Sequence, residues 1–325
     1  MNAPKSGFGK FGGKWTDLKL AVVNEYFTQF NTALSNTKFT RVYIDAFAGG
    51  GRVIPKTEKT ASPKIASKED LFSGHSNNGC SQPVDENEED EAENFRHGSP
   101  LLALETNPPF NEFIFIERDE LTLNQLKQQI SDNRMSRGRP VEYLAEDANT
   151  ALCRISNDDW RERRAVIFLD PFALEIRWST LEAIAQTKAM DMWLLFPAMA
   201  VNRMLPRSTE VPEDWAKRLD ETFGDSSWKA EFYAKPGPPA IDDFFPDSLP
   251  EAKEAKLDDP FGRLNRYVVR RLKTVFAGVV EEALVLKTSS GTPLFLLCFA
   301  VANENGAPIA KRIASHIIKK QKNGI

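Results

Sequence analysis

Short apolar runs alternate with helix-like stretches along most of this 325-residue chain. Each run is nearly continuous in apolar residues, which is typical of parallel strands covered on both faces. The stretches between the runs have the spacing of amphipathic helices. This alternation predicts an α/β fold with a doubly wound parallel sheet. The predicted strands lie at 41–47, 113–117, 141–147, 165–170 and 191–196, with helices at 99–106, 120–130, 149–155 and 179–187.

The last part of the chain predicts an antiparallel hairpin that closes the sheet. Two apolar runs are joined by a turn that contains Gly291 and Pro293. At the other end, an added N-terminal helix is expected at 16–34, with Thr16 as its N-cap. The whole sheet is therefore expected to have seven strands and to be Rossmann-like and mostly parallel. The predicted elements of the last part are helices at 261–276 and 308–320 and strands at 280–287 and 294–300.

Two irregular stretches interrupt the alternation. Residues 53–97 have almost no apolar periodicity, so we expect a disordered acidic insertion there. Seven acids and no Lys or Arg stand between residues 81 and 95, and without them the net charge changes from −4 to +3. Residues 235–259 are rich in proline and charge and predict an irregular surface excursion. Residues 1–325 are otherwise expected to form a single α/β domain.

The composition excludes several other classes of protein. No run of about eighteen apolar residues is present, and the first residues contain no apolar signal core. We therefore expect a cytoplasmic protein that does not cross a membrane. The cysteines (Cys80, Cys153 and Cys298) lie far apart, as do the three histidines. Neither a metal site nor a disulfide framework is predicted, because closely spaced ligands or an even set of cysteines would be needed.

An acid stands at the end of four of the five predicted parallel strands: Asp45, Glu117, Asp147 and Asp170. The carboxyl ends of parallel strands meet at one edge of the sheet, where the ligands of open α/β folds bind. One such acid alone is equally typical of a turn or a helix N-cap. Four in succession favour a shared ligand site.

A glycine-rich turn follows the first predicted strand. Gly49 and Gly51 lack a Cβ atom and let a ligand lie close to the backbone, and Phe47 stands beside them. The dinucleotide fingerprint fails because Ile54 stands where a third glycine is required, and no Gly-Lys-Ser/Thr follows for a phosphate-binding loop. A nucleotide-like ligand is expected, whereas a hydride-transferring enzyme is disfavoured.

Glu117 and Asp147 are candidates for binding an adenosine. Once the insertion is left out, Glu117 lies about 27 residues beyond Asp45, near the roughly 20 typical of a ribose-binding acid. Asp147, followed by Ala148, ends the third predicted strand and is placed to bond an adenine amino group. Capping of the next helix by Asp147 is the alternative interpretation.

The segment Asp170-Pro171-Phe172 ends the fourth predicted strand. Pro171 restricts the backbone and leaves the Asp170 carboxylate facing the crevice. The Phe172 ring is suited to stacking on a planar base. An ordinary strand-to-helix turn with a core phenylalanine is the alternative. Glu175 follows closely and is expected to line the same pocket.

Together these residues resemble the motifs of class I S-adenosylmethionine (SAM) methyltransferases. The first motif of that class is similar to residues 45–51, its ribose acid to Glu117, its adenine acid to Asp147 and its fourth motif to residues 170–172. The resemblance implies SAM as the cofactor and a seven-stranded sheet that ends in an antiparallel hairpin.

Several further segments resemble one particular protein family more closely. They are Phe11-Gly-Gly-Lys-Trp-Thr16, Lys19-Leu20, Tyr43-Ile-Asp-Ala-Phe-Ala-Gly49, Gly98-Ser-Pro-Leu101, Phe115-Ile-Glu117 and Phe168-Leu-Asp-Pro-Phe-Ala173. In these segments the chain resembles the three-Cys-motif partner protein (TcmP) family. The resemblance implies a bacterial protein that works with a separate three-Cys-motif, radical-SAM-like partner. The chain's own three cysteines do not form such a motif.

The fourth motif departs from the Asp/Asn-Pro-Pro-Tyr/Phe of amino-directed DNA methyltransferases. Phe172 and Ala173 stand at its third and fourth positions. Asp-Pro-Phe resembles the fourth motif of guanine-N2 tRNA methyltransferases, so amine methylation stays open. Carbon methylation is disfavoured because Cys153 lies in a predicted helix, away from the strand ends.

These inferences predict a SAM-dependent methyltransferase-like protein in which Asp170 and Phe172 act on an amine, such as that of a nucleic-acid base. Lys14 and Trp15 are expected to close over the methionine end of SAM, and packing of Trp15 on the sheet is the alternative. Arginines within 134–139 and 161–164 suit phosphate contacts, although a solvated surface explains them equally well. The alternative function is a non-catalytic SAM- or nucleotide-binding partner or scaffold.

Overall fold

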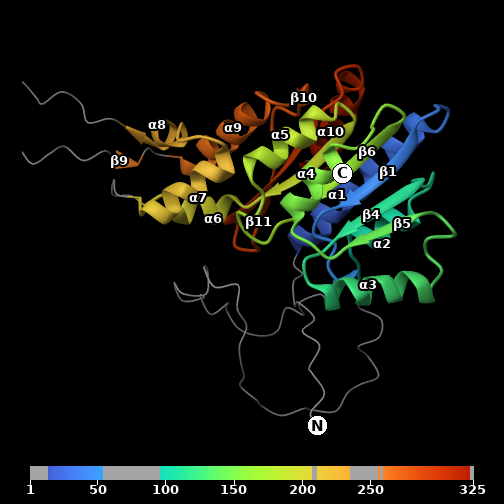
Figure 1. Ribbon diagram of the computed structural model, residues 1–325. Coiled ribbons are helices and arrows are strands. Elements are labelled where there is room, and N and C mark those ends of the chain that lie inside the picture. The colour runs from blue at the N-terminus through green and yellow to red at the C-terminus, as the bar shows by residue number, and fades with distance from the viewer. Residues whose placement is uncertain (1–13, 54–95, 207–210, 235–254, 257–258, 323–325) are drawn as a thin grey trace, which may run out of the picture.

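A sheet with helices on both faces forms the centre of the protein, for which we describe a computed structural model (Figure 1). The arrangement is mixed α/β, with the strands in the middle layer and the helices in two outer layers. The structure describes residues 14–53, 96–206, 211–234, 255–256 and 259–322.

Five parallel strands make up most of the sheet, and the first strand of the chain lies in the middle of them. β1 (Thr40–Asp45) pairs with β4 (Glu112–Ile116) on one side and with β6 (Arg163–Leu169) on the other. β5 (Val141–Leu144) lies outside β4, and β7 (Met190–Phe196) lies outside β6. The chain therefore winds in one direction from β1 through β5 and in the other through β7. This reversal creates a switch point beside the carboxyl end of β1.

Antiparallel strands complete the sheet beyond β7. β12 (Pro293–Val301) pairs with β7, and both β11 (Leu284–Lys287) and β10 (Gly278–Val279) pair with the far edge of β12. The predicted fold class, a mostly parallel sheet with a terminal antiparallel hairpin, is confirmed. In the described residues the sheet has eight strands rather than seven. The backbone is interrupted between β10, which ends at Val279, and β11, so the strand predicted at 280–287 is observed only over 284–287.

Two adjacent acids account for that interruption. Glu281 and Glu282 are both exposed and form ion pairs with Lys273 and Lys322 respectively. Successive residues of a strand point to opposite faces, so a regular strand covered by helices would bury one of the two acids. The backbone leaves the ladder here, and both carboxylates reach solvent.

The alternation of side chains along the strands separates two apolar cores. On β1, Tyr43 packs into one core and Val42 and Ile44 into the other. The Tyr43 side is covered by α1 (Lys14–Leu34), α2 (Ser99–Glu105), α3 (Glu120–Asp132) and α10 (Ala307–Lys322). The opposite side is covered by α4 (Ala148–Ser156), α5 (Trp178–Gln186), α6 (Ala198–Met204), α7 (Glu213–Phe223), α8 (Trp228–Phe232) and α9 (Pro260–Leu272).

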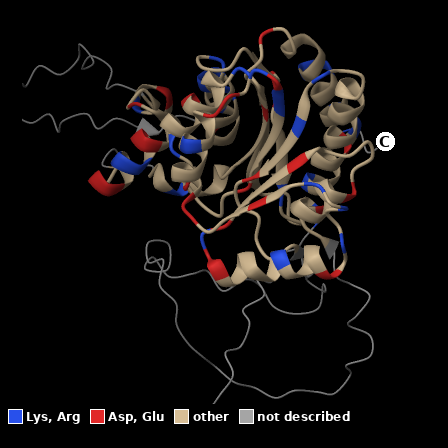
Figure 2. Ribbon diagram, turned by 45° about the vertical axis from the view of Figure 1, so that its right-hand side comes forward, with Lys and Arg blue, Asp and Glu red and all other residues tan. Residues whose placement is uncertain are grey.

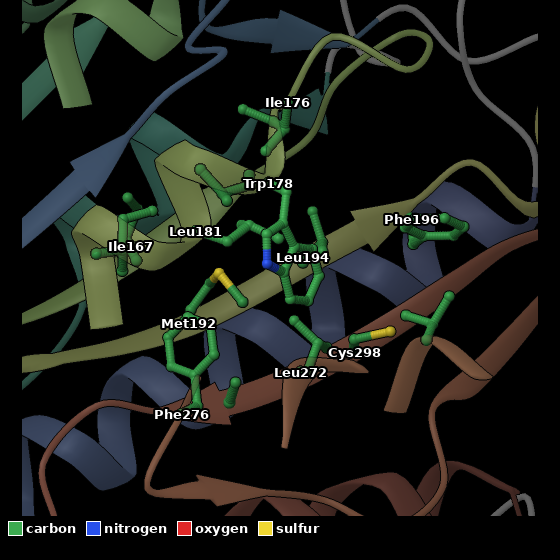
Figure 3. Packing of buried hydrophobic residues seen from close by; sticks show 14 of the residues in the cluster. Ile167, Ile176, Trp178, Leu181, Met192, Leu194, Phe196, Leu272, Phe276 and Cys298 are labelled. Atoms are coloured by element: carbon green, nitrogen blue, oxygen red, sulfur yellow. The ribbon is translucent and has the colours of Figure 1, made fainter. Parts of the chain in front are cut away.

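Figure 3 shows part of the second core, where helix residues meet the sheet. Trp178 from α5 and Leu272 from α9 belong to the same buried cluster as Leu194 of β7 and Cys298 of β12. Burial raises the pKa of the Cys298 thiol to about 12, so this cysteine is a packing residue and not a reactive thiolate.

The sequence predictions contain no counterpart of α6, α7 and α8. The signal for α7 was present, because Leu219, Thr222 and Phe223 are buried at helical spacing on an otherwise charged segment. α1 begins at Lys14, so Thr16 lies inside the helix, and its prediction as the N-cap is wrong.

Short antiparallel ladders close both irregular stretches. β2 (Arg52–Val53) pairs with β3 (Arg96–His97), and the Gly98 amide donates to the Gly51 carbonyl oxygen at 2.9 Å. β8 (Tyr233–Ala234) pairs in the same way with β9 (Ala255–Lys256). The chain thus returns to the fold beside the point where it leaves. The predictions of disorder and irregular structure fall mostly outside the described residues, on 54–95 and 235–254.

Candidate ligand-binding site

A cavity of about 460 Å³ lies at the carboxyl ends of β1, β4 and β6. This size is within the range of small-molecule sites, and the position is the switch point of the sheet. The walls come from the start of α1, the turn after β1, the start of α2 and the loops after β4 and β6, with apolar contributions from Leu20, Leu195 and Phe295.

The glycine turn after β1 forms one wall of this cavity. Gly49 and Gly51 have φ angles of +57° and +84°, in the left-handed region that favours glycine. A Cβ atom on Gly51 would lie 2.8 Å from Leu126 Cδ1, so α3 packs directly behind the turn. The Gln129 side chain of α3 also donates to the Gly50 carbonyl oxygen at 3.0 Å. The turn therefore presents bare backbone to the cavity and is held from behind.

Asp45 lies beneath this turn, fully buried, and not in the cavity wall. Its carboxylate accepts hydrogen bonds from the Tyr43 hydroxyl at 2.8 Å, from the Phe47 amide at 3.3 Å and from the Ser99 side chain. Burial raises the pKa of Asp45 to about 6, and the bonds from Ser99 and Tyr43 oppose that rise. Its observed contacts all support the turn, and Phe47 itself lines the cavity.

Glu117 follows β4 and reaches the same cavity from the neighbouring strand. One carboxylate oxygen accepts the Gly49 amide at 3.1 Å, and the other accepts the Asp119 amide at 3.0 Å. Each oxygen can accept a second hydrogen bond, because a carboxylate offers about four lone-pair positions. Glu117 thus ties two loops together and still presents acceptors to a ligand.

The segment after β6 brings Asp170, Pro171 and Phe172 to the opposite wall. The Phe172 ring is 72% exposed, so the alternative of a core phenylalanine is wrong. Glu175 is outside the cavity wall, and its carboxylate accepts the Phe172 amide at 3.0 Å. Glu175 therefore holds the loop that carries Phe172.

Lys19 of α1 is one of the cavity-wall residues to which sequence reasoning gave no role. It lines the cavity, is buried, and forms an ion pair with Asp170. Its ammonium group also lies 5.4 Å from the ring centroid of Trp15 and 5.8 Å from that of Phe168. A signal existed, since Lys19 lies three and four residues before the buried Val22 and Val23, on the apolar face of the helix.

The remaining predicted residues fall into two groups. Trp15 lines the cavity and packs on Phe295 with ring centroids 5.0 Å apart, whereas Lys14 is exposed and outside the wall. Asp147 is the N-cap of α4, where its side chain accepts the Thr150 amide at 3.1 Å, and Ala148 is buried in the core. The alternative interpretation of Asp147 as a helix cap is therefore confirmed.

Within the described ranges, no three His, Cys, Asp or Glu side chains gather closely enough to hold a metal ion. No helix there has both the length and the apolar character needed to cross a bilayer.

Comparison with known proteins finds neither a matching family model nor a matching curated protein. LPL1258 from Legionella pneumophila, assigned to the family model DUF519, aligns over 96% of this chain and 94% of its own, with 12% identity and a TM-score of 0.45. A protein of Escherichia coli, yhhF, described provisionally as a methyltransferase, aligns over 66% and 79% with 13% identity and a TM-score of 0.27. A conserved hypothetical protein of Streptococcus pyogenes aligns over 57% and 80%, with 15% identity and a TM-score of 0.29.

Proposed function

We propose that this protein is a SAM-dependent methyltransferase that acts on an amine, such as the exocyclic amine of a nucleic-acid base. One observation carries the proposal: the glycine turn, Glu117 and Asp170 line a single cavity at the switch point of the sheet. These residues come from three different strand ends, which meet at the edge of the sheet where the ligands of open α/β folds bind.

The residues of the cavity suit an adenosyl group. Glu117 has spare acceptor positions for the two ribose hydroxyls, and Gly49 and Gly51 leave room for close approach to the backbone. Trp15 and Phe295 supply aromatic surface at the other side. When bound, SAM supplies a methyl group on an electrophilic sulfonium. Asp147, an exposed residue outside the wall of the cavity, stays our candidate for the adenine amino group.

Asp170 and Phe172 are our candidates for positioning the acceptor. The exposed Phe172 ring offers a face for a planar base, and the Asp170 carboxylate can accept a hydrogen bond from the amine. Orientation of the amine toward the methyl group is the main contribution expected from these residues. Lys19 compensates the Asp170 charge while no acceptor is present.

A screen for stabilising ligands tests the binding part of the proposal. We expect the Tm to rise with SAM and S-adenosylhomocysteine and not with NAD or ATP, because only a ligand of the folded state stabilises it. Glu117→Gln should weaken SAM binding about tenfold by removing a charge from the ribose contacts. Glu142→Gln, at an exposed position of β5, is the matched control and should bind SAM normally.

A labelled-methyl assay tests transfer. With RNA or DNA as acceptor, we expect label in the nucleic acid, and Asp170→Ala should abolish it while SAM binding persists. The resemblance to the three-Cys-motif partner family leads us to include a three-Cys-motif, radical-SAM-like partner in this assay. Co-purification of the two proteins from bacterial cells would support that partnership.

A non-catalytic SAM- or nucleotide-binding partner protein is the second candidate. The observation that favours it is the ion pair itself, because Lys19 already occupies the Asp170 carboxylate that an acceptor would need. Selective SAM binding without label in any macromolecule, with the partner present, would establish this second function.

A further inference from the structure

A second cavity, of about 290 Å³, lies behind the glycine turn, between α2 and the end of α3. It shares Gln129 with the turn, because this side chain lines the cavity and donates to the Gly50 carbonyl oxygen. The cavity is otherwise separate from the candidate SAM site and has no lining residue in common with it. Its polar lining side chains include His97, Glu105, Asn133, Arg134 and Arg137.

Two of the three arginines after α3 are free to contact a ligand. In the described chain, neither Arg134 nor Arg137 has an ion-pair or hydrogen-bond partner for its guanidinium, and both residues are exposed. Figure 2 shows Lys and Arg in blue and Asp and Glu in red along the described helices and strands. Two adjacent unpaired guanidiniums in a cavity wall are therefore a local excess of positive charge.

Arg139 has a different task from these two. Its guanidinium donates to the backbone carbonyl oxygens of Leu104, Phe110, Met135 and Ser136, and its centre lies 5.0 Å from the Phe113 ring centroid. Arg139 fastens the loop to the core. Burial lowers the pKa of Arg139, and the nearby positive charge of Arg137 lowers it further. Arg139 thus anchors the loop after α3, although its positive charge and that of Arg137 repel each other.

The backbone of the loop holds both free arginines in an unusual conformation. Arg134 has φ +48° and Arg137 has φ +51°, in the left-handed region that side chains other than Gly, Asn and Asp rarely adopt. Such strain persists where the surrounding structure determines it, and it is concentrated at ligand sites. Here the anchor is Arg139, and the result is that Arg134 and Arg137 both reach the same cavity.

We propose that this cavity is a binding site for a phosphate-bearing ligand, held by Arg134 and Arg137. Guanidinium groups bind phosphate oxygens in pairs through parallel N–H donors, and two guanidiniums match the charge of one phosphate group. Glu105 is the one carboxylate among the lining residues, and it faces His97 Nδ1 at 3.1 Å. The volume of this cavity is at the lower end of the range of small-molecule sites. It has room for the phosphate group and for part of the molecule to which the phosphate is attached.

Binding of two probes tests the site and identifies the source of the phosphate. Pyrophosphate represents a free phosphate compound, and a 5′-labelled single-stranded RNA of about 12 nucleotides represents a nucleic-acid backbone. Titration calorimetry and fluorescence anisotropy give the two dissociation constants. If pyrophosphate binds and RNA does not, the ligand is a small phosphate compound. If RNA binds more tightly, the site takes a backbone phosphate.

The variant Arg134→Asn/Arg137→Asn removes both guanidiniums and keeps a residue that tolerates positive φ. We expect removal of each guanidinium to weaken binding about tenfold. For RNA, the slope of log K against log salt should become shallower by about 0.7 for each phosphate that the variant no longer neutralises. The matched control, Arg218→Gln/Arg266→Gln, removes the same amount of charge from exposed positions elsewhere and should bind the probe normally.

The proposal is overturned if neither probe binds the wild-type protein at millimolar concentration, or if the two double variants bind equally well. The SAM-induced rise in Tm provides an independent readout, because the proposed SAM site has no arginine in its wall. Loss of phosphate binding with that rise intact assigns the effect to the second cavity and excludes misfolding.

Discussion

Lys19 and Asp170, which are 151 residues apart in the sequence, form an ion pair in the wall of the cavity at the end of the sheet. The Lys19 side chain is 7% exposed and that of Asp170 is 25% exposed. Water therefore reaches the carboxylate more easily than the ammonium. The pair joins α1, the added N-terminal helix, to the end of β6. That strand end carries Asp170 and Phe172, our candidates for positioning the methyl acceptor.

Replacement of Lys19 by Met should destabilise the protein by about 2 kcal/mol, because the shielded Asp170 carboxylate loses its counter-charge. Partial exposure of Asp170 keeps the cost below that of a fully buried pair. Lys19→Met/Asp170→Asn, which removes both charges, should recover most of the loss. Urea unfolding of the wild type, Lys19→Met, Asp170→Asn and the double variant measures this. A double variant as unstable as the sum of the single changes would show that the pair has no coupling energy.

Gly49→Ala and Gly51→Ala should have different consequences, although both glycines have positive φ. A Cβ on Gly49 meets nothing within 4 Å, so we expect a stability cost of about 1 kcal/mol and weaker SAM binding, since the methyl group projects into the cavity. A Cβ on Gly51 meets the buried Leu126, so the cost should rise to about 2–3 kcal/mol. Thermal unfolding and SAM titration separate the two effects, and equal unfolding temperatures would contradict the packing argument.

Removal of the Asp45 carboxylate should loosen the glycine turn from below. Asp45→Ala leaves the buried Tyr43 hydroxyl and the Phe47 amide without their acceptor, at a cost of about 3 kcal/mol. Asp45→Asn retains one acceptor oxygen and should cost less than half as much. Chemical denaturation provides the measurement. If both variants are equally unstable, the negative charge rather than the hydrogen bonding of Asp45 supports the turn.

The stability of the protein should fall as the pH rises from about 4 to about 7, because of Asp191 and, to a smaller extent, Asp45, whose pKa is raised to about 6. Burial raises the pKa of Asp191 to about 7, while the hydrogen bond from Tyr26 at 2.7 Å and the charge of Arg164 oppose the rise. In this interval the folded state keeps a proton that the unfolded chain has released. The stabilisation by the protonated Asp191 carboxyl is complete below about pH 4. Where the folded state keeps the proton and the unfolded chain has released it, each pH unit lowers the free energy of unfolding by about 1.4 kcal/mol.

Asp191→Asn removes the contribution of Asp191 to this pH dependence and should be up to about 4 kcal/mol more stable than the wild type at pH 8, with little difference at pH 4. The Asn side chain can still accept the Tyr26 hydroxyl hydrogen. Asp158→Asn, at an exposed position, is the matched control. Denaturation midpoints over this pH range check the prediction, and a variant with the same pH profile as the wild type would refute it.

The order of apolar runs and helical patterns was sufficient to predict the parallel strands and most helices that cover them. Periodicity is a local property, and an apolar run covered on both faces has few alternatives to a buried strand. The acids at the ends of the predicted strands indicated which edge of the sheet holds the candidate site, because the carboxyl ends of parallel strands meet at one edge. Glu117 and Asp170 lie there, in one cavity.

The tertiary structure decided which of those acids line the cavity. Asp45 is the last residue of β1 and is buried under its own turn, and Asp147 lies beyond the end of β5 at Leu144 and caps a helix, whereas Glu117 and Asp170 directly follow their strands. Sequence pattern places a residue at the end of a strand, but the direction of its side chain depends on the loop and on the helices packed against it. The pairing of Lys19 with Asp170 arises in the same way, because it depends on how α1 lies across the sheet, which is a contact between distant parts of the chain.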